Sequence, residues 1–333
     1  MILTQESTIT LRKLGNSDLM LTPLGLGCWQ FSSGKGPVGK YWSVLPPEEV
    51  LKIVHISLEG GINWFDTAEV YGRGESERML AYALNASNSP AAESAYIATK
   101  WWPILRTAGS ITSTIDERIQ LLDHRTIHLY QVHQPYSFSS VASEMNAMAK
   151  LVNQGKIKHV GVSNFSARRM READRVLREH GLRLASNQVK YNLLDRAIEH
   201  NGILDTAKEL GVAIIAYSPL EQGILSGKFH KDTSLVKAIT GIRKWSPSFR
   251  ASKLLRSRPL IDVLDQLAVK YEASPSQIAL NWLIHANGET VFAIPGASKV
   301  RHAEENVKAM RFTLTSGEIA EISSASKRVL EHN

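Results

Sequence analysis

The chain has 333 residues, of which 43% are hydrophobic and 21% charged; this is typical of a globular protein and excludes disordered, collagen-like and coiled-coil chains. Its single Cys excludes an internal disulfide and any metal cage made of several Cys, and it fits a reducing compartment. The formal net charge of +7 points to anionic partners, but no zinc-finger or aromatic-interleaved RNA-binding pattern accompanies it, so we expect no nucleic-acid partner.

The beginning of the sequence and its apolar runs bear on location. Residues 1–15 contain no apolar stretch of the kind found in a signal peptide. The longest apolar runs, such as 212–217, fall well short of the about 20 residues that a membrane span needs. We therefore expect a cytoplasmic protein with no membrane partner.

From residue 24 onward, short apolar segments alternate with longer segments of helical periodicity. The short segments predict eight strands, at 24–28, 62–65, 95–99, 127–132, 157–162, 184–189, 212–217 and 291–294. The segments between them predict helices at 46–60, 75–84, 111–122, 141–153, 166–180 and 201–210.

These elements favour an α/β fold of the closed (β/α)8 type, a TIM barrel. Each strand is a nearly continuous apolar run, as in buried parallel strands, and successive strands lie about 25–40 residues apart, the length of a βα unit. An open doubly wound sheet is the alternative, but its Gly-x-Gly-x-x-Gly pattern fails after Gly25 and Gly27 because Gln30 follows. Length alone allows two domains, yet no linker is present, so we predict one domain over 1–333.

Additions to the barrel account for the remaining length. A lead-in hairpin is expected before Leu24. After the seventh strand, the Gly/Ser/Lys-rich segment 221–252 has no clear periodicity and predicts a long loop that acts as a lid or clamp. Helices are predicted at 257–272 and 275–287, and a C-terminal helix after Ser316.

Polar residues end the predicted strands, where barrel enzymes carry their chemistry. Asp66, Lys100 and His133 end the second, third and fourth strands, and Tyr71 lies in the loop after Asp66. Each has an ordinary structural explanation when taken singly, such as a helix cap or a surface charge. Together, at one level of successive strands, they are expected to converge at the barrel mouth.

The combination predicts proton transfer to an oxygen atom. A Lys ammonium beside Tyr71 would lower the pKa of the phenol from about 10. Asp66 would hold Lys100, and His133 could orient a substrate carbonyl. We expect no metal, because the sequence has no metal-ligand cluster. Carbonyl reduction also needs a hydride, which only a cofactor can supply.

The sequence resembles the aldo-keto reductases over nearly the whole chain, roughly residues 10–325. The resemblance is carried by Gly25-Leu26-Gly27-Cys28-Trp29, Asp66-Thr67-Ala68-x-x-Tyr71-Gly72, Leu129-Tyr130-Gln131-Val132-His133-Gln134-Pro135, Gly155-Lys156-Ile157-x-x-x-Gly161-Val162-Ser163-Asn164-Phe165, Gln188-x-x-Tyr191-Asn192, Ala216-Tyr217-Ser218-Pro219-Leu220, Ile294-Pro295-Gly296-Ala297 and Glu305-Asn306. It implies an NADPH-dependent oxidoreductase that reduces small aldehydes and ketones, with Tyr71 as general acid in a catalytic tetrad with Asp66, Lys100 and His133.

The resemblance also implies how NADPH is bound. Ser163, Asn164 and Gln188 would hold the nicotinamide carboxamide, and Tyr217 would stack on the ring. The pyrophosphate would lie along Ser218, Leu220, Gln222, Gly223 and Leu225, and the adenine against Glu305 and Asn306. The remaining cofactor-binding residues are expected to be Gly27, Cys28, Trp29, Gly296, Ser298, Lys299 and His302.

One departure from the family pattern concerns the cofactor's 2′-phosphate. Gly296, Ala297 and His302 stand where many members carry Lys, Ser and Arg. The segment Ile294-Pro295-Gly296-Ala297 resembles the signature of a subgroup of the family that is similar to potassium-channel β subunits and bacterial general-stress reductases. Candidates for the phosphate are then Ser298, Lys299, Arg301, His302 and cations within 253–258. NADPH remains preferred over NADH, and a slow redox-sensing NADPH-binding subunit of a channel or transporter is the alternative function.

Aromatic residues follow the first and third strands and predict an apolar substrate pocket of Trp29, Phe31, Trp101 and Trp102. Core packing explains any one of them equally well. The loop 134–140 after His133 is short, which predicts an open mouth and broad selectivity. The sequence specifies neither the substrate nor an oligomeric state.

Overall fold

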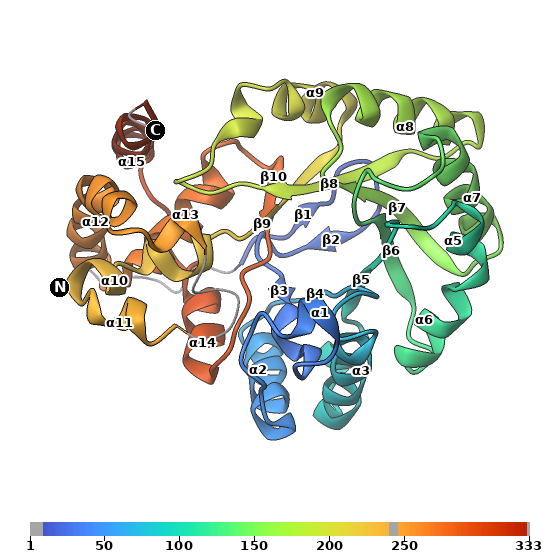
Figure 1. The fold of residues 1–333 in the computed structure, drawn as a ribbon, viewed down its shortest axis with the longest axis horizontal. Coiled ribbons are helices and arrows are strands. Elements are labelled where there is room, and N and C mark those ends of the chain that lie inside the picture. The colour runs from blue at the N-terminus through green and yellow to red at the C-terminus, as the bar shows by residue number, and fades with distance from the viewer. Residues whose placement is uncertain (1–8, 240–245, 332–333) are drawn as a thin grey trace.

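The computed structural model describes residues 9–239 and 246–331. Eight parallel strands follow one another around a sheet in chain order, surrounded by helices (Figure 1). They are β3 (Leu26–Gly27), β4 (Trp64–Asp66), β5 (Tyr96–Trp101), β6 (Ile127–Val132), β7 (Ile157–Ser163), β8 (Leu184–Lys190), β9 (Ala213–Tyr217) and β10 (Val291–Ala293). All eight predicted strands are confirmed.

The sheet closes between its first and last strands. Parallel bridges join Leu24 to Ala293 and Gly27 to Gly296, and the Gly27 amide donates to the carbonyl of Pro295 at 3.1 Å. A Cβ atom on Gly27 would lie 2.8 Å from the Ile294 carbonyl oxygen, so the close approach of the two segments needs glycine there. These bonds confirm the predicted (β/α)8 barrel.

The helices of the barrel layer agree with prediction within a few residues, with one exception. They are α2 (Pro47–Glu59), α3 (Glu75–Ser87), α7 (Val141–Asn153), α8 (Ala167–Glu179) and α9 (Ile203–Leu210). The predicted helix 111–122 is instead two, α5 (Gly109–Ser113) and α6 (Ile115–Leu121). They meet at Thr114, whose φ of −110° departs from the usual helical value of about −63° and whose hydroxyl donates to the Ser110 carbonyl at 2.7 Å.

The predicted N-terminal hairpin is present as β1 (Arg12–Lys13) and β2 (Met20–Leu21), which pair antiparallel. Its buried Leu14 packs in one cluster with Trp64 and Phe292 from the barrel strands. Asn16 donates its side-chain amide to the carbonyls of Leu184 and Leu210, at 3.1 and 2.9 Å. Leu184 is the first residue of β8 and Leu210 lies just before β9, so the hairpin closes the amino end of the barrel, opposite the end where the strands finish.

The segment after β9 is more ordered than predicted. The residues described within 221–252 form short helical turns, η3 (Glu221–Ser226), α10 (Lys228–Lys231), α11 (Ser234–Lys237) and η5 (Pro247–Phe249), while residues 240–245 of the predicted loop lie outside the described part. Next come α12 (Ala251–Lys270), α13 (Pro275–His285), α14 (Val300–Lys308) and α15 (Ser316–Glu331). Among the described helices, none is long and apolar enough to cross a membrane.

The remaining short elements lie in loops of the barrel. They are η1 (Trp29–Ser32), α1 (Gly36–Gly39), α4 (Pro90–Glu93) and η2 (Ala197–Glu199). Of these, η1 begins directly after β3 and so places Trp29 at the carboxyl end of the barrel, where the strand-end residues also lie.

Candidate active site

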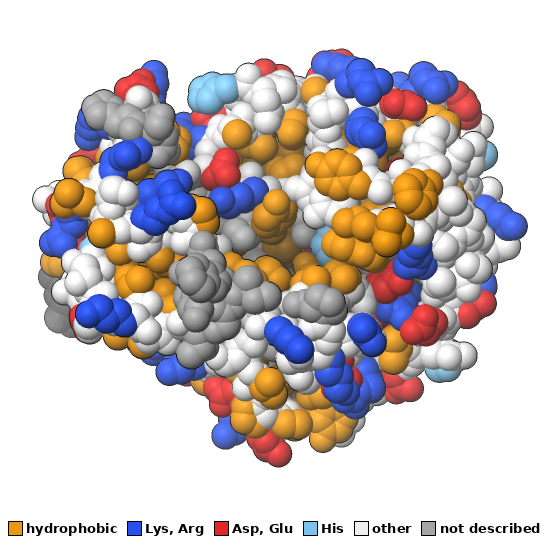
Figure 2. Space-filling model, viewed as in Figure 1, with side chains coloured by type: hydrophobic (Ala, Val, Ile, Leu, Met, Phe, Trp, Pro, Cys, Tyr) orange, Lys and Arg blue, Asp and Glu red, His pale blue; other side chains and the backbone are white. Residues whose placement is uncertain are grey.

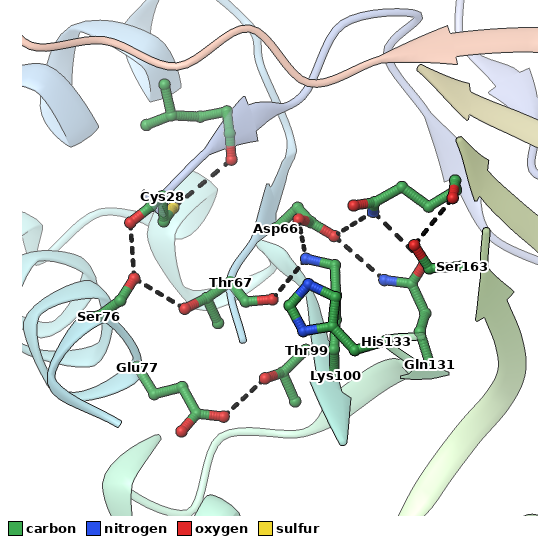
Figure 3. Close-up of polar contacts among 12 residues, drawn as sticks. Cys28, Asp66, Thr67, Ser76, Glu77, Thr99, Lys100, Gln131, His133 and Ser163 are labelled. Atoms are coloured by element: carbon green, nitrogen blue, oxygen red, sulfur yellow. Dashed lines mark hydrogen bonds and ion pairs between the residues drawn. The ribbon is translucent and has the colours of Figure 1, made fainter. Parts of the chain in front are cut away.

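A buried ion pair lies at the carboxyl ends of β4 and β5. Asp66 is the last residue of β4, and Lys100 precedes the last residue of β5. The Lys100 ammonium pairs with Asp66 Oδ1 and also donates to the Thr67 carbonyl at 2.8 Å (Figure 3). Burial alone would lower the pKa of Lys100, but Asp66 and the Tyr71 phenol outweigh burial and raise it, so the side chain stays a cation.

Two amide side chains fix the other oxygen of this carboxylate. Asp66 Oδ2 accepts hydrogen bonds from Gln131 Nε2 at 3.1 Å and from Gln188 Nε2 at 2.9 Å. Gln131 comes from β6 and Gln188 from β8, so residues from across the barrel orient the ion pair. Gln188 was expected to hold the nicotinamide carboxamide; it lines the cavity described below, but its amide nitrogen points to Asp66.

Tyr71 lies beside this pair, in the loop between β4 and α3. The Lys100 Nζ atom is 5.0 Å from the centroid of the phenol ring. Burial raises the pKa of Tyr71 above 10, and the charge of Lys100 lowers it by less. The expectation that Lys100 would bring this pKa below its ordinary value is therefore wrong, because desolvation of the phenolate dominates. The phenol keeps its proton at neutral pH.

His133, directly after β6, forms the other wall of the site. Its ring meets Tyr71 edge-on at 5.6 Å between centroids and Trp102 edge-on at 5.2 Å. Burial, helped by the charge of Lys100, lowers the pKa of His133 well below 6.5. The imidazole is thus neutral, and its buried Nδ1 has no hydrogen-bond partner within the described residues. A neutral imidazole can donate to, or accept from, a polar group of a substrate.

These residues border a cavity of about 680 Å³ at the barrel mouth, visible as the central hollow in Figure 2. Of the expected site residues, the cavity is lined by Gly27, Cys28, Trp29, Asp66, Tyr71, Trp102, His133, Ser163, Asn164, Gln188, Tyr217, Ser218, Leu220, Gln222, Gly223, Gly296, Ser298, His302, Glu305 and Asn306. The structure therefore brings together residues from both ends of the chain, as a long ligand such as a dinucleotide requires.

The cavity wall after β9 has features that fit an anionic, hydrogen-bonding ligand. Ser218, Glu221, Gln222 and Gly223 have positive φ angles of 52°, 44°, 55° and 90°, and loops of this kind turn backbone N–H groups toward anions. The buried Asn306 lines the cavity, and its Nδ2 has no partner among the described residues. A buried donor without a partner costs free energy unless a ligand satisfies it.

Comparison with known proteins identifies the family. The model of the Aldo/keto reductase family matches residues 23–327. The chain belongs to the aldo/keto reductase family. An uncharacterized oxidoreductase of Mycobacterium tuberculosis (strain ATCC 25618 / H37Rv) is 36% identical over 293 residues, which cover 88% of this chain and 85% of that protein.

Other similar proteins agree with this membership. The Glycine max protein named "Probable aldo-keto reductase 1" is 29% identical over 94% of this chain and 88% of its own length. A glycerol dehydrogenase from Gluconobacter oxydans superposes with a TM-score of 0.82 at 28% identity, covering 97% of this chain and 96% of the other. A thermostable aldo-keto reductase crystallised with the inhibitor epalrestat gives a TM-score of 0.72 at 28% identity, over 95% and 99% of the two chains.

Several residues expected at the site of this aldo-keto reductase do not line the cavity. Phe31 and Trp101 are buried in the hydrophobic core, and the Trp101 indole donates to Ser110 of α5, on the outer face of the strand. Leu225 is also a core residue. Lys299, directly before α14, does not reach the cavity, and neither do residues 253–258 of α12. Lys100 lies behind the wall, paired with Asp66 and 5.0 Å from the centroid of the Tyr71 ring.

His302 lines the cavity but is not a cation. Its Nδ1 accepts from the Ser298 amide at 3.3 Å. Burial and the charges of Arg301, Lys228 and Lys299 lower the pKa of His302 to about 4. At neutral pH it therefore offers a phosphate a neutral ring, while Arg301 and Lys228, which also line the cavity, carry the positive charge.

The sequence reading of this reductase missed other lining residues. They include Gln30, Val38, Tyr41, Val70, Gln134, Pro219, Ser226, Lys228, Ser274 and Ser276. Ser274 and Ser276 lie at the start of α13, which no strand-end argument reaches. Lys228 follows Gly227, which has a positive φ of 75°. In the sequence, the closely spaced Gly223 and Gly227 indicate turns there, and these turns bring Lys228 back to the cavity.

Proposed function

We propose that this aldo-keto reductase reduces aldehydes and ketones to alcohols with NADPH as the hydride donor and Tyr71 as the general acid. The observation that carries the proposal is the protonated Tyr71 phenol beside the buried Lys100–Asp66 pair, at the wall of a cavity that also offers a dinucleotide site. Because the described residues hold no cluster of His, Cys, Asp and Glu suited to a metal ion, the proposal uses none.

Side chains of the protein supply the proton that the carbonyl oxygen gains. Tyr71 holds a proton at its phenol oxygen and donates it to the carbonyl oxygen as negative charge develops there. Lys100, kept charged by Asp66, stabilises the phenolate left behind. Neutral His133 orients the carbonyl by a hydrogen bond. When bound, the nicotinamide supplies the hydride.

The residues that would hold the cofactor follow from the cavity wall. Ser163 and Asn164 would face the nicotinamide end, with Tyr217 beside them, since the Tyr217 hydroxyl donates to Asn164 Oδ1 at 3.1 Å. The loop after β9 would bind the pyrophosphate, and Asn306 the adenine. Arg301 and Lys228 are the cations that favour a 2′-phosphate, and hence NADPH over NADH.

Replacement of Tyr71 tests the proposal. Tyr71→Phe keeps the ring that stacks 5.8 Å from Trp29 but removes the proton donor. We expect kcat for aromatic aldehydes, followed by NADPH absorbance, to fall about 10²–10⁴-fold. NADPH binding, followed by quenching of Trp fluorescence, should be unchanged. Full activity in this variant would show that another group delivers the proton.

Cofactor preference has its own test. We expect NADPH to bind about tenfold or more tightly than NADH, since a charge-assisted bond to a phosphate is worth about 1.5–3 kcal/mol. Arg301→Ala should weaken NADPH binding and leave NADH binding nearly unchanged. Fluorescence titration with both nucleotides measures this, and equal losses for the two would remove Arg301 from the phosphate site.

A further inference from the structure

Two neighbouring loops at the barrel mouth expose large apolar side chains. Ile104 and Leu105 follow β5, and Tyr136 and Phe138 follow β6. Their exposed fractions are 38%, 78%, 67% and 71%. We call these four residues the apolar rim. Single exposed apolar residues are common on proteins, but a group of four on adjacent loops marks a binding surface.

The apolar rim continues the wall of the cavity. Trp102 and Gln134 both line the cavity, and each lies two residues before a rim residue, Ile104 and Tyr136 respectively. Figure 2 shows hydrophobic side chains gathered along the edge of the central hollow. A molecule that extends out of the cavity past Trp102 therefore meets this surface first.

The two loops form one structural unit. The Phe138 amide donates to the Arg106 carbonyl at 2.9 Å, and the Ala108 amide donates to the Ser139 hydroxyl at 2.9 Å. The loop after β5 is also attached to the Tyr71 loop, because Glu69 accepts from the Trp102 amide at 3.1 Å. The rim thus holds a fixed position relative to the general acid.

Polar side chains of these loops are engaged inside the protein. Arg106 pairs with Glu69, the Ser137 hydroxyl donates to Glu144 at 2.6 Å, and Gln134 accepts from Asn164 at 3.2 Å. Apart from the hydroxyls of Tyr136 and Thr107, what the loops present to an approaching molecule is consequently hydrocarbon. A sugar or a charged metabolite finds few polar partners in these two loops.

Leu105 is held in an unfavourable backbone conformation. Its φ angle is +60°, in the left-handed region, within a turn closed by the hydrogen bond from the Arg106 amide to the Pro103 carbonyl at 3.0 Å. Such a turn position favours Gly or Asn over a branched apolar residue. Strained residues of this kind gather at ligand-binding sites, and here the strain holds an exposed leucine at the mouth.

From these observations we propose that the apolar rim binds the hydrocarbon tail of the carbonyl substrate, so that the enzyme prefers aldehydes with long alkyl or arylalkyl chains. This inference rests on the proposed reductase function. The reacting carbonyl lies against Tyr71, and the tail runs past Trp102 onto Leu105 and Phe138.

A homologous series of straight-chain aldehydes, from butanal to decanal, tests the inference. A fully buried methylene gains up to about fourfold in affinity, so about twofold is expected for one lying on an open surface. We therefore expect kcat/KM to rise about twofold per carbon over the longer members of the series.

Variants of the rim locate the effect. In the double variant Leu105→Gly with Phe138→Ser, kcat/KM for butanal should stay within twofold of the wild type, while the rise with chain length disappears. Leu255→Ser and Val269→Ser on α12 remove equally exposed apolar side chains away from the mouth, and they should keep the rise. Leu105→Gly alone should unfold at the same temperature or higher, because it relieves the strain.

The outcomes separate this inference from the proposed function. If butanal and decanal are reduced equally well by the wild type, the reductase stands and the tail site is wrong. If the rise persists in the double variant, the tail binds elsewhere and the inference is also wrong. A change in oligomer size on gel filtration, with the rise intact, would assign the rim to contact between copies instead. If no aldehyde is reduced, the proposed function itself fails.

Discussion

Tyr71 and His133 of the candidate active site show how burial sets the protonation of single side chains. Burial raises the pKa of Tyr71 and lowers that of His133, so at neutral pH the site holds a protonated phenol and a neutral imidazole. The proposed reduction would use both in these forms, because the carbonyl oxygen must gain a proton and the imidazole need only make a hydrogen bond.

These pKa directions predict a flat pH profile for reduction. The acid must carry its proton, and Tyr71 loses it only as the pH rises through a pKa above 10. His133 gains a proton only well below pH 6.5. We expect kcat with saturating NADPH to vary less than about twofold between pH 6.5 and 9. A decline centred near pH 7 would mean that another group titrates in the reaction.

The Lys100–Asp66 pair predicts a large coupling in stability. Both side chains are buried, so removing one leaves an uncompensated charge. Asp66→Asn and Lys100→Met should each lower the free energy of unfolding by about 3–5 kcal/mol. The double variant should lose less than the sum of the two, because no charge remains buried. Urea unfolding of all four proteins measures the coupling, and simple additivity would argue against it.

At the scale of elements, a second buried carboxylate braces the loop that would bind the pyrophosphate. Glu221, the first residue of η3, accepts hydrogen bonds from Asn192 Nδ2 at 3.0 Å and from the Ser248 hydroxyl at 2.7 Å, and it pairs with Lys190 at 3.0 Å. These partners come from the end of β8, the loop after it and η5. One carboxylate thereby fastens three segments around the cofactor loop.

Loss of this brace should weaken cofactor binding. Lys190→Met leaves the Glu221 carboxylate buried without its cation, and we expect the Kd for NADPH to rise about tenfold, corresponding to about 1.4 kcal/mol. Lys231→Met, which breaks the exposed pair with Asp265, is the matched control and should leave the Kd unchanged. Fluorescence titration measures the Kd for NADPH of both variants. Equal affinities would contradict the role of the Glu221 contacts in holding the loop that would bind the pyrophosphate.

Sequence patterns predicted helices and strands well where buried residues recur at a regular spacing. They predicted poorly where a single side chain determines the end of an element or the face that a residue occupies. The eight strands and most helices were predictable from apolar runs. The break at Thr114 depends on a side-chain hydrogen bond, and α12 begins at Ala251 and continues through Pro259, where a helix start near 257 was expected. Trp101 and Trp102 are adjacent and face opposite sides of the strand end, so only the register decided which one lines the cavity.

At the scale of the whole molecule, the N-terminal hairpin fits against the barrel without spare room. Gly15 has a φ of +49°, and a Cβ atom there would lie 2.3 Å from the Ala185 carbonyl oxygen and 2.7 Å from the Ala213 nitrogen. Because both neighbours are backbone atoms of barrel strands, they cannot move aside cheaply. The closed end of the barrel thus depends on a residue far in sequence from the strands that it touches.

Gly15→Ala should accordingly destabilise the entire fold by more than about 2 kcal/mol, through strain and the clash with the strands. Gly181→Ala provides the control, since Gly181 also has a positive φ, of +71°, but no atom lies within 4 Å of its added Cβ. It should lose only about 1 kcal/mol. Thermal or chemical denaturation measures both, and equal losses would show that the clash is relieved by local movement.

The closure of the barrel between β3 and β10 has a consequence for how the protein is made. During synthesis β3 emerges long before β10, so β3 and β9 remain open sheet edges until residues 291–293 have been made. The cavity is lined by Gly27 from one side of this junction and by Asn306 from the other, so a chain that ends before residue 306 lacks part of the cavity wall. The nucleotide of the proposed function would bind across the junction and so stabilise only molecules in which β3 and β10 have joined, and its concentration in the cell would help to set how many of them survive.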